Sequence, residues 1–155
     1  MYNANDLLLE GHAFARGKVK NKKQAISDLT QRMAAALKLD ARALAEAVHE
    51  RERLGSTGIG EGVAIPHARM EGVGRAVASV LVLEEPIGFD AIDGNPCDII
   101  VLLLAPVSAS AEHLRALAKL SRALRQPETR QAVRAARNSS QLALALNGRS
   151  QPDAA

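Results

Sequence analysis

The sequence predicts a mixed α/β domain in which helices flank a mixed β-sheet on both sides. Segments with the spacing of amphipathic helices occupy both ends of the 155-residue chain, and two nearly continuous apolar runs lie between them, at residues 75–83 and 98–105. Apolar runs of this kind, rich in β-branched residues, are typical of strands that are covered on both faces. A layered domain with helices against each face of the sheet buries such strands.

In the N-terminal half, two helices precede a glycine-rich loop. The first begins after Asn21 and the second at Asp40, because both residue types cap helix N-termini. Gly55 favours the end of the second helix. A short apolar strand at residues 63–65 follows the loop. The residues expected to face the core are Ala25, Ile26, Leu29, Met33 and Ala36 in the first helix, and Leu44, Ala47 and Val48 in the second.

The middle of the chain supplies the predicted central strands. Residues 75–83 form the first of them, and Glu85-Pro86 is expected to break it, leaving a short edge piece at residues 86–91. Asp93-Gly94-Asn95-Pro96 is a strong turn signal. Residues 98–105 then form the second buried strand, which Pro106 ends.

Three helices are predicted after the second strand. Ser110 is expected to cap a helix that runs to Arg125. Pro127 suits the first turn of the next helix, to about residue 137, and Ser139 or Ser140 caps a last short one. The inner residues of the first of these helices are Leu114, Leu117, Leu120 and Leu124. Residues 1–147 are thus expected to form a single domain, followed by a disordered tail at residues 148–155.

The amino-acid composition excludes several classes of partner and environment. Hydrophobic residues make up 47% and charged residues 24%, a soluble globular mixture, with a net charge of +3. Aromatic residues are only 2%, so the stacking platforms of single-strand binders are absent, and we expect no nucleic-acid partner. Cys97 is the only cysteine, which rules out an intramolecular disulfide. The N-terminus lacks the basic region of a signal peptide and the apolar run at residues 99–105 is too short to span a bilayer, so we expect no membrane insertion and a cytoplasmic location.

Residues 51–69 carry the candidate site. They read Arg-Glu-Arg-Leu-Gly-Ser-Thr-Gly-Ile-Gly-Glu-Gly-Val-Ala-Ile-Pro-His-Ala-Arg. A neutral imidazole such as that of His67 is a good nucleophile for phosphorus. Phosphoryl transfer otherwise requires positioning and positive charge, which Arg51 and Arg69 offer. Glycine loops let backbone N–H groups approach an anion; the loop residues predicted to bind phosphate are Ser56, Thr57, Gly58 and Gly60.

Local pattern alone leaves a plainer interpretation open, in which His67 only follows a proline at a turn. His113, in the first turn of the helix after the second strand, is either a supporting partner of His67 or a half-exposed helix-start residue. The glycine loop leads from a helix into a strand, the reverse of the dinucleotide fingerprint, and no P-loop is present. Four scattered histidines and one cysteine give no metal-ligand spacing. We therefore expect neither a nucleotide cofactor nor a metal.

Residues 54–67 closely resemble the active-site segment of the enzyme IIA proteins of the bacterial phosphotransferase system, in its fructose–mannitol branch, and most of all its nitrogen-regulatory members. The resemblance runs from about Val19 to about Leu146, with supporting segments at residues 85–94 and 112–114. It implies a mixed sheet flanked by helices and phosphorylation of a ring nitrogen of His67. It further implies that Arg51 lies near that site and that His113 packs beside His67.

The resemblance implies a phosphohistidine relay, in which an HPr-like phosphocarrier phosphorylates His67 and the state of His67 controls regulatory partners. An alternative is a sugar-specific IIA component that passes the phosphoryl group to a IIB protein. A third hypothesis is a binding module that keeps the fold without turning over phosphate. One departure is visible: Ala68-Arg69 follows His67 where many relatives have Gly-Lys, which keeps the positive charge.

Overall fold

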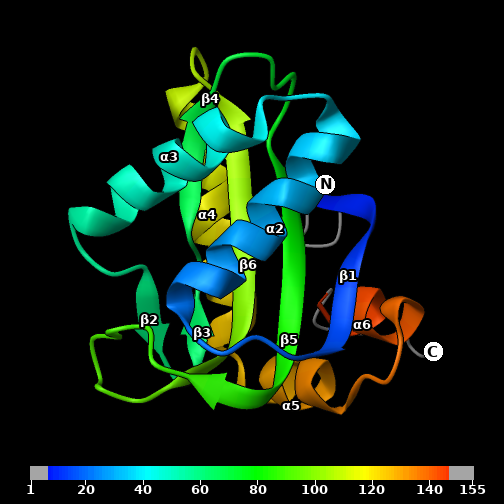
Figure 1. Cartoon of the computed structure of the whole chain (residues 1–155). Helices are drawn as coiled ribbons and strands as arrows, with labels where there is room; N and C mark the ends of the chain where they lie inside the picture. Colours follow the sequence, from blue (N-terminus) through cyan, green and yellow to red (C-terminus); the bar gives the residue numbers. More distant parts are fainter. Residues whose placement is uncertain (1–6, 147–155) are drawn as a thin grey trace.

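The computed structural model describes residues 7–146, which build a six-stranded mixed sheet covered by helices (Figure 1). Its strand order is β1-β5-β6-β3-β2, and β4 also pairs with β6. The strands are β1 (Leu8–Gly17), β2 (Gly58–Gly60), β3 (Val63–Ala64), β4 (His67–Met70), β5 (Val77–Ile87) and β6 (Cys97–Pro106). The helices are α2 (Lys22–Leu37), α3 (Ala41–Arg53), α4 (Ser110–Arg125), α5 (Pro127–Ala135) and α6 (Ser139–Leu146).

Strand β6 organises the sheet. It runs antiparallel to β5, whereas β3 and then β4 run parallel to it along its other edge. Strand β1 is parallel to β5, and β2 is antiparallel to β3. The chain thus leaves β6 at Ala64 and returns to it at His67, which lies opposite Leu103. This placement puts His67 beside the carboxyl end of the central strand.

Helices cover both faces of the sheet, as the sequence predicts. Figure 1 shows α2 and α3 across the front and α4 behind β6. Side chains of β6 alternate between the two layers: Val101 and Leu103 pack with α4–α6, whereas Leu102 and Leu104 pack with α2 and α3. The continuous apolarity of this strand therefore follows from its burial on both faces.

The predicted helix starts are confirmed at α2 and α3. The Asn21 side chain accepts a hydrogen bond from the backbone N–H of Gln24 at 2.9 Å, and Asp40 accepts from that of Arg42 at 3.0 Å. The amide oxygen of Asn21 and the carboxylate oxygen of Asp40 thus each accept from a backbone N–H that has no partner within the first helical turn. Of the predicted inward residues in α2, only Ala36 is exposed.

The predicted end of the second helix is confirmed: α3 ends at Arg53, Leu54 is its C-cap, and the N–H of Gly55 donates to the carbonyl oxygen of Glu52. Other predicted boundaries are wrong. Strand β5 continues through Pro86 to Ile87, where we expected a break; a register shift between Val82 and Ile87 interrupts its ladder there, so the missing N–H of proline is tolerated. Strands β1, β2 and β4 were not predicted, and no separate edge piece forms at residues 86–91.

Helix α4 spans the predicted residues but differs at its first turn. The residue before it is Ala109, which makes no side-chain cap bond, and Ser110 is the first helical residue. Leu114, expected inside, is 68% exposed. Leu120 and Leu124 are buried as predicted. The first turn of α4 therefore faces a solvent-open region near His67.

The predicted tail at residues 148–155 lies outside the described residues. Within residues 7–146, no helix is long and apolar enough to cross a membrane.

Candidate functional site

His67 is the first residue of β4 and is only 8% exposed. Its Nδ1 lies 2.7 Å from the carbonyl oxygen of Ile65. A carbonyl oxygen only accepts, so Nδ1 carries the hydrogen and Nε2 keeps its lone pair. Burial, and secondarily the charge of Arg51, lower the pKa of His67, against the opposing effects of the Ile65 hydrogen bond and Glu52. The imidazole is therefore neutral at physiological pH, in the tautomer whose Nε2 carries the free lone pair.

His113, in the first turn of α4, packs edge-on against His67, with ring centroids 5.3 Å apart and an interplanar angle of 71°. Its Nε2 is buried and has no hydrogen-bond partner among the described residues. Burial, followed by the charges of His67, Arg69 and Arg51, lowers the pKa of His113 to about 4. A neutral ring beside His67 adds no competing positive charge. The two rings are in contact, as expected, and the supporting role of His113 stays a prediction.

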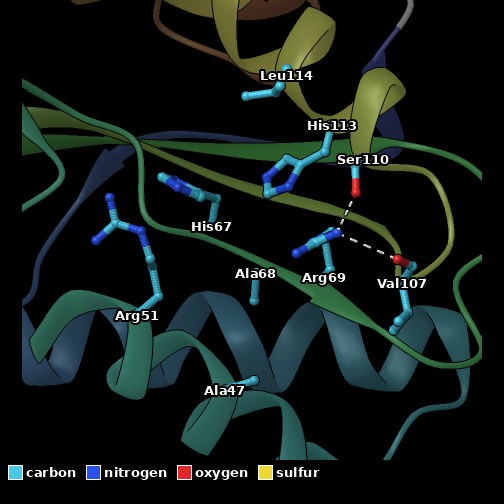
Figure 2. A pocket seen from close by; sticks show the side chains of 9 residues that line it. All are labelled: Ala47, Arg51, His67, Ala68, Arg69, Val107, Ser110, His113 and Leu114. Carbon is cyan, nitrogen blue, oxygen red and sulfur yellow. Dashed lines mark hydrogen bonds between the residues drawn. The ribbon is translucent and has the colours of Figure 1, made fainter. Parts of the chain in front are cut away.

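Two arginines complete the pocket in Figure 2. Arg51, in the last turn of α3, donates through Nη1 to the carbonyl oxygen of Gly55 at 3.0 Å. Arg69, on β4, donates through Nη1 to Ser110 Oγ at 2.6 Å and to the carbonyl oxygen of Val107 at 3.4 Å. Neither guanidinium forms a salt bridge within residues 7–146.

The pocket has a volume of about 580 Å³. None of the described residues that line it is acidic, so it concentrates positive charge around His67. Those residues are Ala47, Arg51, His67, Ala68, Arg69, Val107, Ser110, His113 and Leu114. A small anion that enters this pocket meets two guanidinium groups that no carboxylate neutralises.

The glycine loop lies outside this pocket. Ser56, Thr57, Gly58 and Gly60 are not among its lining residues. The backbone N–H of Thr57 donates to the Glu52 carboxylate, and that of Gly58 donates to Ser56 Oγ, so neither is free to bind a phosphate. Gly58 and Gly60 pair with β3. Phosphate binding by these four residues stays a prediction, without geometric support from the structure.

Comparisons with known proteins identify the family of this chain. A family model described as "Phosphoenolpyruvate-dependent sugar phosphotransferase system, EIIA 2" matches residues 6–148. This chain belongs to that EIIA family. The nitrogen regulatory protein of Bradyrhizobium diazoefficiens is 40% identical over 121 residues, covering 78% of this chain and 79% of that protein.

Two solved structures show the same EIIA architecture. The crystal structure of the nitrogen regulatory protein IIA-Ntr from Neisseria meningitidis matches with a TM-score of 0.86 at 34% identity, covering 92% of this chain and 97% of that one. The crystal structure of IIA mannitol from Escherichia coli matches with a TM-score of 0.75 at 18% identity, over 90% and 98% of the two chains, which shows likeness of fold alone.

These findings confirm the predicted family, the mixed α/β fold and the assignment to the phosphoryl-relay components of the phosphotransferase system, in its nitrogen-regulatory group. EIIA membership implies phosphoryl exchange with phosphocarriers of that system. Among residues 7–146, no cluster of three or more histidine, cysteine, aspartate or glutamate side chains is arranged to hold a metal ion.

Sequence reasoning missed one residue next to the EIIA site. Glu52 follows Arg51 in the last turn of α3, and its side chain is only 5% exposed. It accepts hydrogen bonds from the N–H and the hydroxyl of Thr57, and it lies 3.0 Å from Lys22 Nζ. The sequence placed it in a charged helix turn of the kind that usually faces solvent. The only signal that could have marked it is Thr57, five residues later, whose N–H and hydroxyl can both donate to a carboxylate.

Acidification is expected to destabilise the fold through His113. Its pKa falls from 6.5 to about 4 in the folded protein, so between these values the unfolded chain binds a proton that the folded chain does not. The free energy of unfolding is therefore highest above pH 6.5 and decreases as the pH falls toward 4. Denaturant unfolding at a series of pH values measures this slope. A His113→Gln variant is expected to show a shallower slope in the same window, and an unchanged slope would contradict the assignment.

Proposed function

We propose that Nε2 of His67 accepts a phosphoryl group from an HPr-like phosphocarrier. One observation carries the proposal: Nδ1 is held by the Ile65 carbonyl, which leaves Nε2 as the free nucleophile in a pocket with two arginines and no acidic lining residue. The new bond joins Nε2 to phosphorus as the bond from phosphorus to the donor histidine breaks. The hydrogen on Nδ1 stays in place, where the Ile65 carbonyl stabilises the positive ring that forms.

The arginines have different parts in this step. Arg51 has a single backbone acceptor, so most of its donors are available to the phosphoryl oxygens. Arg69 is shared with Ser110 and Val107 and supplies charge from the opposite wall. His113 fills the space beside the ring without adding charge. Catalysis then rests on positioning and electrostatic stabilisation, as phosphoryl transfer requires.

The phosphorylated state is proposed to control protein partners. A phosphoryl group adds about two negative charges to the pocket, which offset much of its positive charge and change the surface around Val107 and Leu114. A partner docked there distinguishes the two states. Relatives with the name nitrogen regulatory protein, at 40% and 34% identity, support a regulatory role. A cytoplasmic location is part of the same proposal, because the carrier must reach His67 directly.

Incubation of the protein with phosphoenolpyruvate, enzyme I and the phosphocarrier tests the proposal. Intact-mass measurement is expected to show one phosphoryl group per chain, stable in base and lost in acid, as a phosphohistidine is. A chain that stays unmodified while the carrier is phosphorylated would overturn the proposal and favour a binding module without turnover.

A sugar-specific role is separated by a second incubation. The phosphorylated protein is mixed with fructose- and mannitol-type IIB proteins, and loss of label from His67 is followed. The regulatory proposal predicts slow transfer to every IIB protein tried. Rapid transfer to one of them would assign the chain to carbohydrate uptake instead.

A further inference from the structure

A buried ion pair lies next to the phosphoryl pocket and outside its lining. Glu52 is held by the charge of Lys22 from α2 and by two donors of Thr57, all at 2.8 to 3.0 Å. Lys22 also lies 3.5 Å from Asp90 and 5.0 Å from the centre of the Phe89 ring. A buried carboxylate costs free energy unless such partners compensate it. The arrangement therefore fixes Glu52 in one place, between α2, α3 and the chain that follows α3.

The carboxylate of Glu52 holds the far end of the turn that leaves α3. The near end of that turn is bound to the helix, where the N–H of Leu54 donates to Arg51 O and the N–H of Gly55 donates to Glu52 O. The two hydrogen bonds from Thr57 to the Glu52 side chain close the other end. Gly55 and Leu54 are exposed and have no packing of their own to hold them. The Ser56 hydroxyl also donates to the Phe89 carbonyl oxygen, and the N–H of Ile65 donates to the Thr57 carbonyl oxygen. Glu52 is therefore one of several groups that hold the turn, and it is the one that ties the turn back to the end of α3, next to Arg51.

The Gly55 carbonyl oxygen is the hydrogen-bond acceptor of Arg51 Nη1, at 3.0 Å. Arginine carries several rotatable bonds, and an unheld guanidinium samples many positions. The bond to Gly55 restricts Arg51 to rotamers that line the His67 pocket. The contacts therefore form a connected series from Lys22 through Glu52, Thr57 and Gly55 to Arg51 (Figure 2 shows its last member).

We propose that Glu52 is a positioning residue for phosphoryl transfer, which holds the turn at residues 54–57 so that the Gly55 carbonyl directs the guanidinium of Arg51 toward His67. The proposal rests on the phosphoryl transfer to His67 proposed above. It differs from a purely stabilising role in one respect: the effect of Glu52 on the transfer rate passes through Arg51. Glu52 also favours a higher pKa of His67, in the direction opposite to Arg51.

A double-mutant cycle tests this coupling. The rate of phosphorylation by the loaded phosphocarrier is measured for the unaltered protein, Glu52→Gln, Arg51→Ala and the double variant. Glu52→Gln keeps the shape of the side chain and one acceptor oxygen, but it replaces the other acceptor of Thr57 with an amide donor and loses the charge that pairs with Lys22. We expect Glu52→Gln alone to slow phosphorylation about tenfold and to have no further effect in the Arg51→Ala background.

The remaining outcomes overturn the inference. An equal slowing in both backgrounds would show that Glu52 acts independently of Arg51, and an unchanged rate for Glu52→Gln would show that it does not act at all. Glu50→Gln is the matched control, because Glu50 lies on the same helix and pairs only with Arg53 in the described residues; its rate is expected to stay unchanged.

A second variant guards against misfolding. Thr57→Val removes the hydroxyl bond to Glu52 and keeps the backbone bond and the side-chain shape. It is expected to slow phosphorylation less than Glu52→Gln, again only when Arg51 is present, and an equal effect without Arg51 would count against the proposal. If the unaltered protein accepts no phosphoryl group, the proposed function fails; if it does and the cycle is additive, only the role of Glu52 fails.

Discussion

Replacing His67 with alanine is expected to abolish phosphorylation by the phosphocarrier, with a loss of roughly a thousandfold or more, because no other group in the pocket can act as the nucleophile. His113 is the only other imidazole that lines the pocket, and its pKa of about 4 and buried Nε2 make it a poor acceptor. His67 lies at the wall of an open pocket, so its removal leaves a space that water can fill, and we expect the fold to remain. Intact-mass measurement and a thermal unfolding curve check both statements.

The position of the phosphoryl group tests the tautomer. Because Nδ1–H donates a hydrogen bond to the Ile65 carbonyl, the phosphoryl group is expected on Nε2. Nitrogen chemical shifts of the labelled ring distinguish the two nitrogens, and a signal for the Nδ1 isomer would contradict this geometry. His49→Ala serves as the control: His49 is on α3 and outside the pocket, so this variant is expected to be phosphorylated at the normal rate.

Much of this site could be predicted from residues 51–69, because its chemistry is local in sequence. Arg51, His67 and Arg69 are close enough in the chain for their types and spacing to suggest phosphate chemistry. The position of His113 could be predicted only from the order of strands and helices. A helix that follows a central strand begins at the carboxyl edge of the sheet, where β4 also lies. Once the two apolar strands are recognised, the location of His113 at this edge can be inferred.

The glycine loop was the misleading part of the pattern. Gly58 is needed because a Cβ there would lie 2.8 Å from the Cβ of Ala91, and Gly60 because its φ is +102°. These are requirements of packing and backbone conformation. A sequence cannot separate them from the close approach of an anion, because both needs select glycine.

Strand β1 went unpredicted for a different reason. It is an edge strand with glycines within it, only Ala13 is buried among its residues, and its pairing with β5 shifts register twice. The sequence of such a strand shows neither an alternation of apolar and polar residues nor a continuous apolar run, so hydrophobic periodicity does not identify it. Its place in the sheet comes from pairing with β5, which no local pattern encodes.

Replacing Arg51 with alanine is expected to slow phosphorylation about 100-fold while the fold stays intact. The Arg51 guanidinium supplies positive charge for the phosphoryl oxygens. It has no carboxylate partner in the described residues, so no structural salt bridge neutralises it. Its one bond, to the exposed Gly55 carbonyl, contributes at most about 1 kcal/mol to the free energy of unfolding. Rapid-quench measurement of phosphoryl transfer and denaturant unfolding separate the two effects.

Three companion variants make the Arg51 prediction specific. Arg51→Lys keeps the charge and loses the planar pair of donors, so an intermediate rate is expected. Arg69→Gln is expected to be less damaging than Arg51→Ala, because Ser110 and Val107 already hold part of the Arg69 guanidinium away from the reacting atoms. Arg53→Ala removes an arginine two residues further along, which pairs with Glu50 and does not line the pocket, and should leave the rate unchanged. If Arg51→Ala matched Arg53→Ala in rate, Arg51 would have no part in phosphoryl transfer, and the positive charge at His67 would come from Arg69 alone.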